Sequence, residues 1–176
     1  MQIIGLFSAG IFLSFLEFNF TGLGILNLKI EFNLITMLIL LNLITSIMEE
    51  VIFRKRLLDY LNEIIDKFYI SNIIVSLLFS ILHFSSLKNS ATIFLISMSL
   101  GIIKHKTEKL IFCMTFHFSH NFFIDLIYGS MYSFINFKGL FDGKVSMNNG
   151  STKLLASALF FVALNKIYSS KNENVL

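Results

Sequence analysis

The sequence contains no proline and no tryptophan, only one cysteine in 176 residues, and few charged side chains. The absence of proline excludes helices kinked by a proline ring. The single cysteine, Cys113, excludes a disulfide bond within the chain. Only 14% of the residues are charged, whereas 55% are apolar, 21 residues are phenylalanine and the mean hydropathy is +0.76. This composition is typical of an integral membrane protein, for which membrane lipid is the surrounding partner.

The small positive net charge does not indicate a nucleic-acid-binding protein. The formal charge is +3, but the basic residues lie between apolar runs, as they do in the loops of a membrane protein. The first apolar segment has no Lys or Arg before it and no small-residue cleavage site after it. We therefore expect a retained membrane anchor there rather than a cleaved signal peptide.

Apolar segments recur along the whole chain. The six segments cover residues 3–20, 34–47, 72–87, 91–103, 110–132 and 154–168. A perpendicular span needs about 20 residues, so the third, fourth and sixth segments must borrow flanking residues or lie in thinned bilayer. Backbone amides in lipid must be satisfied within their own segment, and the alternation of a membrane β-barrel is missing. The sequence therefore predicts an all-α, polytopic helical membrane protein of about six transmembrane helices, forming a single domain over residues 1–176.

Two stretches between the apolar segments have their own patterns. In residues 53–68, apolar side chains recur at helical spacing opposite a charged face, which predicts an amphipathic helix at the cytoplasmic interface. Residues 136–153 are hydrophilic and interrupted by glycine, which predicts an exposed loop. In the six-span topology, nine Lys and Arg fall on the side of both termini and five on the other, which predicts cytoplasmic termini.

Ionisable side chains in the apolar segments are candidates for function, because each costs about 2.5–3.5 kcal/mol at membrane depth on insertion scales. In MEEVIFR, Glu50 and Arg54 are four residues apart and can pair on a helix, whereas Glu49 lies about 100° around the axis. A carboxylate beside a like charge in a low-dielectric setting is suited to act as a general base. The alternative interpretation is a helix end at the interface with a surface ion pair.

A histidine marks the third apolar segment. In FSILH, Phe79 and His83 are four residues apart, and the histidine lies deep in the apolar run. The alternative to a functional role is a hydrogen bond from His83 to a carbonyl on a neighbouring helix.

The fifth segment carries the densest group of polar side chains. In HFSHN, His117 and Asn121 share one helix face, and His120 lies about 60° to the other side of His117. Asp125 follows one turn after Asn121. The alternative interpretation of this group is hydrogen bonding between helices.

Taken together, the three groups resemble one protein family. EEVIFR, FSILH and HFSHN match, in order, the patterns Glu-Glu-x-x-x-Arg, Phe-x-x-x-His and His-x-x-x-Asn. These patterns define the CPBP intramembrane proteases, also called the Abi or CAAX-protease family, which includes type II CAAX prenyl endopeptidases. The stretch 101–117 also looks like the family's short cytoplasmic turn before the third motif. The resemblance covers about residues 34–128, and one departure is Lys55, where family members commonly have glycine.

The resemblance implies an intramembrane endopeptidase with a named set of catalytic residues. Glu49 and His83 would bind and activate the attacking water, and His117 with Asn121 would hold the oxyanion of the tetrahedral intermediate. Glu50 would tune its neighbour, and Arg54 would support the set by pairing with Glu50 and fixing the helix end. Donors aimed at an oxyanion are typically worth about 2.7–4 kcal/mol each.

The resemblance leaves the cofactor open, because the family is often labelled a metalloprotease. If zinc is bound, its ligands would be Glu49, His83 and His117. The dense ligand pairing of an H-E-x-x-H helix is absent, however, and asparagine is a poor zinc ligand. We therefore expect a glutamate-activated water without a metal.

The resemblance implies peptides or lipidated proteins as substrates. These are prenylated CAAX C-termini in some members and, in bacterial relatives, bacteriocins, signalling peptides or self-immunity targets. Cys113 lies one turn before His117 and offers a thiol nucleophile as another possibility, although unpaired cysteines in apolar helices are usually packing residues. The sequence leaves the oligomeric state open.

Two other functions are compatible with the same residues. A proton-linked transporter also uses intramembrane Glu, His and Asp, and it predicts solute flux and tolerance of Asn121→Ala. A non-catalytic immunity or scaffold membrane protein predicts that Glu49→Gln keeps the phenotype. A hydrolase predicts that Glu49→Gln, His83→Ala and His117→Ala each abolish cleavage while the protein still accumulates in the membrane.

Overall fold

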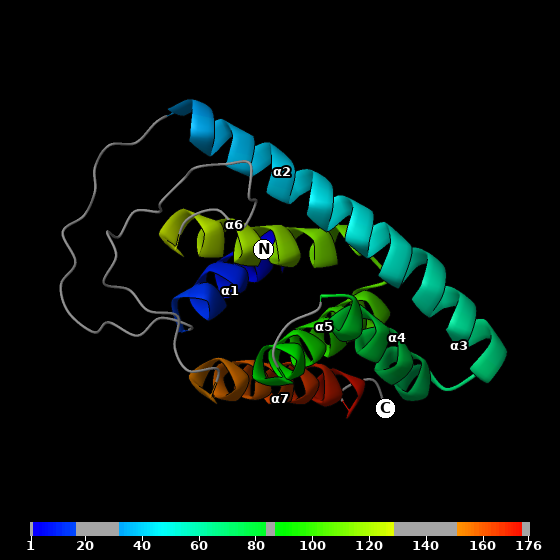
Figure 1. Cartoon of the computed structure of the whole chain (residues 1–176). Helices are drawn as coiled ribbons and strands as arrows, with labels where there is room; N and C mark the ends of the chain where they lie inside the picture. Colours follow the sequence, from blue (N-terminus) through cyan, green and yellow to red (C-terminus); the bar gives the residue numbers. More distant parts are fainter. Residues whose placement is uncertain (1, 17–31, 84–86, 129–150, 174–176) are drawn as a thin grey trace. The chain divides into compact units, whose positions relative to one another are not determined.

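The computed structural model describes residues 2–16, 32–83, 87–128 and 151–173. All elements in these ranges are helical, so the all-α prediction is confirmed (Figure 1). They are α1 (Gln2–Leu16), α2 (Phe32–Glu50), the π-helix η1 (Val51–Leu58), α3 (Asp59–Ile65), α4 (Phe68–Leu82), α5 (Leu87–Thr107), α6 (Leu110–Tyr128) and α7 (Ser151–Glu173).

The chain divides into two compact units. One comprises Met1–Met48 and Met114–Asn149, and the other comprises Glu49–Cys113 and Gly150–Leu176. Each unit is described by itself below. A single domain over residues 1–176 stays a prediction.

Two of the described helical stretches are long and apolar enough to cross a membrane: Phe32–Ile65 and Leu110–Ile127. Shorter apolar helices cover Ile3–Ser14, Phe68–Leu82 and Leu154–Ile167. The short fourth and sixth segments lie in α5 and α7, which are 21 and 23 residues long, but neither helix is among these two candidate spans. The total of about six transmembrane helices stays a prediction.

The predicted amphipathic stretch continues the preceding span. Residues up to Ile65 are helical and follow α2 through η1 and α3. The helix ends where Asp66 adopts the left-handed conformation (φ 52°, ψ 29°) and its N–H donates to the carbonyl of Asn62 at 3.0 Å. The predicted loop 136–153 lies outside the described residues, except for 151–153, which begin α7.

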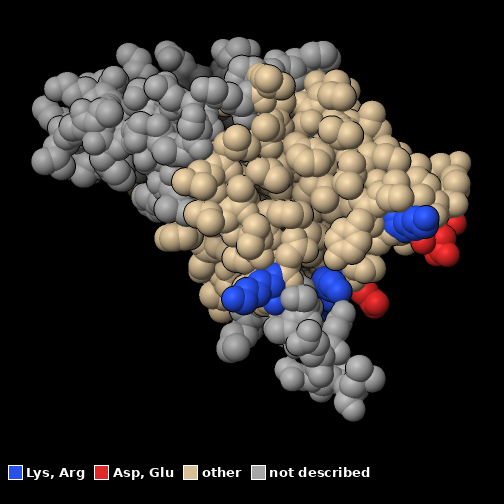
Figure 2. Space-filling view, turned by 90° about the horizontal axis from the view of Figure 1, so that it is seen from below, with Lys and Arg blue, Asp and Glu red and all other residues tan. Residues whose placement is uncertain are grey.

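The exposed and buried faces of α2 and η1 are reversed relative to a soluble helix. Large apolar side chains point outward, for example Leu40, Ile44 and Ile52, each at least 50% exposed. Every fourth residue is buried, and this stripe is mostly polar: Leu38, Asn42, Ser46, Glu50, Arg54 and Leu58. On the face that Figure 2 shows, the charged side chains lie along the edge of the described part. Such a surface suits lipid.

In the second unit, α5 packs against both α4 and α7, and η1 and α3 pack against α4 (Figure 1). The α4–α5 contact is close because Gly101 faces Asn72: a Cβ at Gly101 would lie 2.5 Å from the Asn72 Cγ. The Asn72 amide also donates to the carbonyl of Met98 at 3.0 Å. Small residues and interhelical hydrogen bonds are the usual means of packing helices in lipid.

In the first unit, α6 contacts both α1 and α2. Ser14 on α1 donates its hydroxyl to the carbonyl of His120 on α6 at 2.9 Å. One turn earlier, a Cβ at Gly10 would lie 2.8 Å from the Phe116 carbonyl oxygen, so only glycine permits this approach. Asn42 on α2 hydrogen-bonds Asp125 on α6. The helix that carries the HFSHN motif is thus held from two sides within its own unit.

Candidate active site

The first motif lies where α2 passes into η1. Glu50 and Arg54 both have a relative exposure of 0%, and the Arg54 Nε lies 3.4 Å from the Glu50 Oε2. The predicted pairing is therefore confirmed, and the alternative of a surface ion pair is wrong. A buried pair of this kind must be supported by further hydrogen bonds, because both charges have left water.

Contacts from two other helices provide this support for Arg54. Its Nη2 donates to the backbone oxygen of Ser97 at 3.1 Å and to the Ser97 hydroxyl at 2.8 Å. The guanidinium carbon lies 4.8 Å from the ring centroid of Phe79. Arg54 therefore joins η1 to α4 and α5, which fixes the position of the helix end that carries Glu49. The Glu49 side chain itself is half-buried.

The helix widens within the motif. Val51–Leu58 form eight residues of π-helix, in which the backbone hydrogen bonds run from i to i+5. The angles predicted from the sequence assume α-helical spacing throughout the motif. That spacing holds at Glu49 and Glu50, which end α2, but not at Arg54, which lies in the π-helix. π-helical segments are rare and often occur at functional sites, and no pattern in the residues predicted this one.

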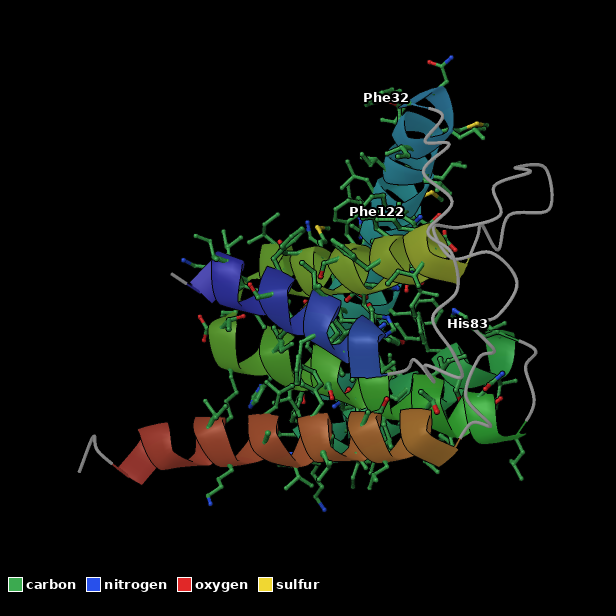
Figure 3. All side chains as sticks on the ribbon, turned by 90° about the vertical axis from the view of Figure 1, so that its left-hand side faces the viewer. Phe32, His83 and Phe122 are labelled. Carbon is green, nitrogen blue, oxygen red and sulfur yellow. The ribbon has the colours of Figure 1, made fainter. Side chains whose placement is uncertain are left out.

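His83 lies at the end of α4 (Figure 3), directly after Leu82, and its side chain is exposed. The expectation that it lies deep in an apolar helix is wrong, because α4 stops one residue before it. The ring Nδ1 is 2.7 Å from the Phe79 carbonyl oxygen of its own helix, not of a neighbouring one. A carbonyl only accepts, so Nδ1 carries the proton and Nε2 is left as an acceptor.

Phe79 connects the first two motifs. Its ring centroid lies 4.4 Å from the His83 ring and 4.9 Å from the Phe53 ring, in addition to its contact with Arg54. The structure thus brings EEVIFR and FSILH together within one unit. From the sequence, Phe79 had no role beyond its match to the motif. Its contact with Arg54 could not be predicted, because that contact depends on how α4 packs against η1.

The third motif belongs to the other unit. His117 and His120 are buried at 5% exposure, and Asn121 is half-buried. The His120 ring stacks on Phe116, with centroids 6.2 Å apart. Asp125 is 2% exposed and accepts a hydrogen bond from Asn42, so interhelical hydrogen bonding, the alternative interpretation, is confirmed for this residue. The meeting of HFSHN with the first two motifs stays a prediction.

Comparison with known proteins identifies a family. A family model described as type II CAAX prenyl endopeptidase Rce1-like matches residues 31–123, just over half of the chain. The chain belongs to the Rce1-like family. The matched segment contains all three motifs, and the predicted resemblance is thereby confirmed. No curated protein and no solved structure matches the chain.

Rce1-like proteins are membrane-embedded proteases of the CAAX type. Together with the apolar exposed helices, membership identifies an integral membrane protein. It also implies protease activity on a peptide or a prenylated protein.

The residues of this Rce1-like chain fit a metal only in part. Glu49 and the Nε2 of His83 have the right donor chemistry for zinc, but the third expected ligand, His117, lies in the other unit. Among the described residues, no group of three or more His, Cys, Asp or Glu side chains is placed to hold a metal ion. A water activated without a metal therefore stays the prediction, and a zinc site stays its alternative.

Cys113 has the surroundings of a packing residue. It is completely buried, and its Sγ donates to the Leu100 carbonyl at 3.3 Å. Reactive cysteines are generally partly exposed in electropositive surroundings. Its environment therefore supports the packing role over that of a nucleophile.

Proposed function

We propose that this chain hydrolyses a peptide bond at the membrane by means of a water activated by Glu49 and His83. The observation that supports this most is the joining of the first two motifs through Arg54 and Phe79 within one unit. This contact places the helix end that carries Glu49 in the same packed group as the helix end that carries His83.

In the proposed first step, the water donates one hydrogen bond to the Glu49 carboxylate and the other to the Nε2 of His83. Both hydrogens are then engaged, so an oxygen lone pair faces the substrate carbonyl. The tautomer of His83 is suited to this role because its Nδ1 already donates to the Phe79 carbonyl. Glu49 takes the proton as the oxygen–carbon bond forms.

In the second step, His117 and Asn121 donate hydrogen bonds to the oxyanion of the tetrahedral intermediate. Each donor in such a site is typically worth about 2.7–4 kcal/mol of barrier. Collapse of the intermediate breaks the carbon–nitrogen bond, and Glu49 returns its proton to the leaving amine. Glu50 stays paired with Arg54 throughout, and this pair holds the helix end that carries Glu49. If zinc is bound, Glu49, His83 and His117 would hold it, and polarisation of the water is the chemistry that it would supply.

For the substrate, we propose a peptide ending in a prenylated C-a-a-X sequence, with a bacteriocin-related peptide or self-immunity target as the alternative. We also propose that both termini face the cytoplasm, on the distribution of Lys and Arg. Fusion of a fluorescent protein to each terminus would test this: fluorescence from both is expected, and an externally exposed terminus would contradict it.

The decisive experiment incubates detergent-purified protein with a prenylated C-a-a-X peptide. We expect Glu49→Gln to lower the cleavage rate by about 100-fold or more, the usual contribution of a general base. Glu63→Gln is the matched control, because Glu63 is an exposed carboxylate on α3. Cleavage by Glu49→Gln at the wild-type rate would contradict the assignment. Comparing wild type with and without a chelator tests the metal, since loss of cleavage on chelation requires one.

A further inference from the structure

A buried polar pair joins the two longest apolar helices of the first unit. The Asn42 Nδ2 donates to the Asp125 Oδ2 at 2.8 Å and to the Leu38 carbonyl at 3.0 Å. Both members of the pair are 2% exposed. Asp125 lies two residues beyond the segment matched by the family, and Asn42 belongs to none of the three motifs. The proposed reaction uses neither residue.

The hydrogen bond between Asn42 and Asp125 forms at one position of α6 along α2, whereas apolar contacts form at several. Lipid gives helices no hydrophobic reason to prefer one register over another. A slip of one turn, about 5.4 Å, would replace apolar side chains of α6 by other apolar side chains, since Phe118 and Phe122 are one turn apart on the helix. The same slip would separate Asn42 from Asp125 and leave a buried carboxylate and a buried amide without each other.

The pair is also placed at helical spacing from the motif residues. Asp125 lies four residues after Asn121 and eight after His117, so the three lie along one side of α6. On the other helix, Asn42 belongs to the buried stripe that reaches Glu50 eight residues later. A displacement of α6 at the pair therefore also moves His117 and Asn121 relative to α2.

We propose that Asn42 and Asp125 form a register pin, which fixes the height and rotation of α6 on α2. They are positioning residues: the pin determines where His117 and Asn121 present their hydrogen-bond donors. This consequence for catalysis rests on the proposed function, whereas the pin itself does not.

The test compares two ways of replacing the pair. Asn42→Leu with Asp125→Leu removes both polar groups of the pair and keeps apolar packing at the contact. Without the pin, we expect kcat to fall about 100-fold with little change in KM, as for a small misplacement of catalytic groups. Asn42→Asp with Asp125→Asn restores an amide–carboxylate pair in the opposite direction and should recover kcat. Thr36→Ala is the control, because the Thr36 hydroxyl bonds only to its own helix, at the Phe32 carbonyl.

A second readout requires no activity. With Cys113→Ser as background, spin labels are attached at Ile44→Cys on α2 and Phe118→Cys on α6. We expect one narrow distance distribution in the wild-type pair and in the exchanged pair, and a broad or doubled one in the double-leucine variant. A narrow distribution and wild-type kcat in the double-leucine variant would overturn the pin. If wild type cleaves no peptide, the proposed function fails, and the distance distribution alone decides the pin.

Discussion

The Arg54 side chain connects η1 to α4 and α5 in the second unit. Its pairing with Glu50 followed from a spacing of four residues. Its contacts with Ser97 and Phe79 did not, because they join elements far apart in sequence, 43 residues in the case of Ser97. Local spacing predicts neighbours on one helix, whereas contacts between helices depend on how those helices pack.

Ser97→Ala tests whether these contacts support the buried guanidinium. The substitution removes the 2.8 Å acceptor of Arg54 but keeps the backbone oxygen, so we expect a loss of about 1–2 kcal/mol in the free energy of unfolding. Ser99→Ala is the matched control, since the Ser99 hydroxyl is buried on the same helix and bonds only to the Leu95 carbonyl. Thermal unfolding in detergent measures both. Equal losses in the two variants would mean that the bond to Arg54 contributes nothing.

His105 predicts a pH dependence at the basic end of α5. The ring is only partly withdrawn from water, and this partial burial, followed by the charges of Lys106 and Lys104, lowers its pKa below the ordinary value of 6.5. The folded state therefore favours the neutral ring, which stacks on Phe68 at 3.9 Å between centroids. This contribution to stability is complete above pH 6.5 and is lost as the pH falls through 6.5 toward the lowered pKa.

We therefore expect the melting temperature of wild type to fall more than that of His105→Gln when the pH is lowered from above 6.5 to below it. Melting curves of the two proteins at matched pH values measure this difference. Parallel pH profiles would contradict the lowered pKa, and an NMR titration of the His105 ring locates the transition directly.

At the scale of the elements, the packing of α1 against α6 could not be predicted from the sequence. Its apolar run predicted a membrane anchor, but nothing in the run indicated which helix it would touch. In the structure its Gly10 and Ser14 lie against α6 at Phe116 and His120. The helix lies outside the segment matched by the family, yet it contacts the backbone of the third motif.

Two glycines of α1 give opposite predictions for the same substitution. A Cβ at Gly10 would lie 2.8 Å from the Phe116 carbonyl oxygen, so Gly10→Ala should destabilise the protein by about 1–3 kcal/mol. A Cβ at Gly5 would meet nothing within 4 Å, so Gly5→Ala should be neutral or stabilising by up to about 1 kcal/mol, because alanine favours the helix. Thermal unfolding of both variants is the measurement. A Gly10→Ala protein as stable as Gly5→Ala would show that α1 does not pack closely on α6.

The ends of elements were harder to predict than their existence. The apolar run 72–87 gave no sign that α4 stops at Leu82, which moved His83 from a helix interior to a helix end. The widening of the helix over Val51–Leu58 was equally hidden, because hydrophobic spacing does not distinguish an i to i+5 hydrogen-bond pattern over two turns.

At the scale of the whole molecule, composition sufficed for the all-α membrane class, since lipid permits few other structures. The three motifs sufficed for the family. Composition and motifs could not predict which face of α2 is buried, nor that this face is mostly polar. The buried face of a lipid-exposed helix depends on the helices that pack against it. In the proposed function, the motifs of both units serve one reaction centre.

Cross-linking tests this claim most directly. In a Cys113→Ser background, His83→Cys and His117→Cys are treated in membranes with a short thiol-specific cross-linker. Asp59→Cys with Lys104→Cys is the positive control, because these two residues form an ion pair within one unit, with 3.3 Å between the Lys104 Nζ and the Asp59 Oδ1. We predict that the histidine positions cross-link as efficiently as the control pair. Efficient cross-linking of the control without any between positions 83 and 117 would contradict a shared centre.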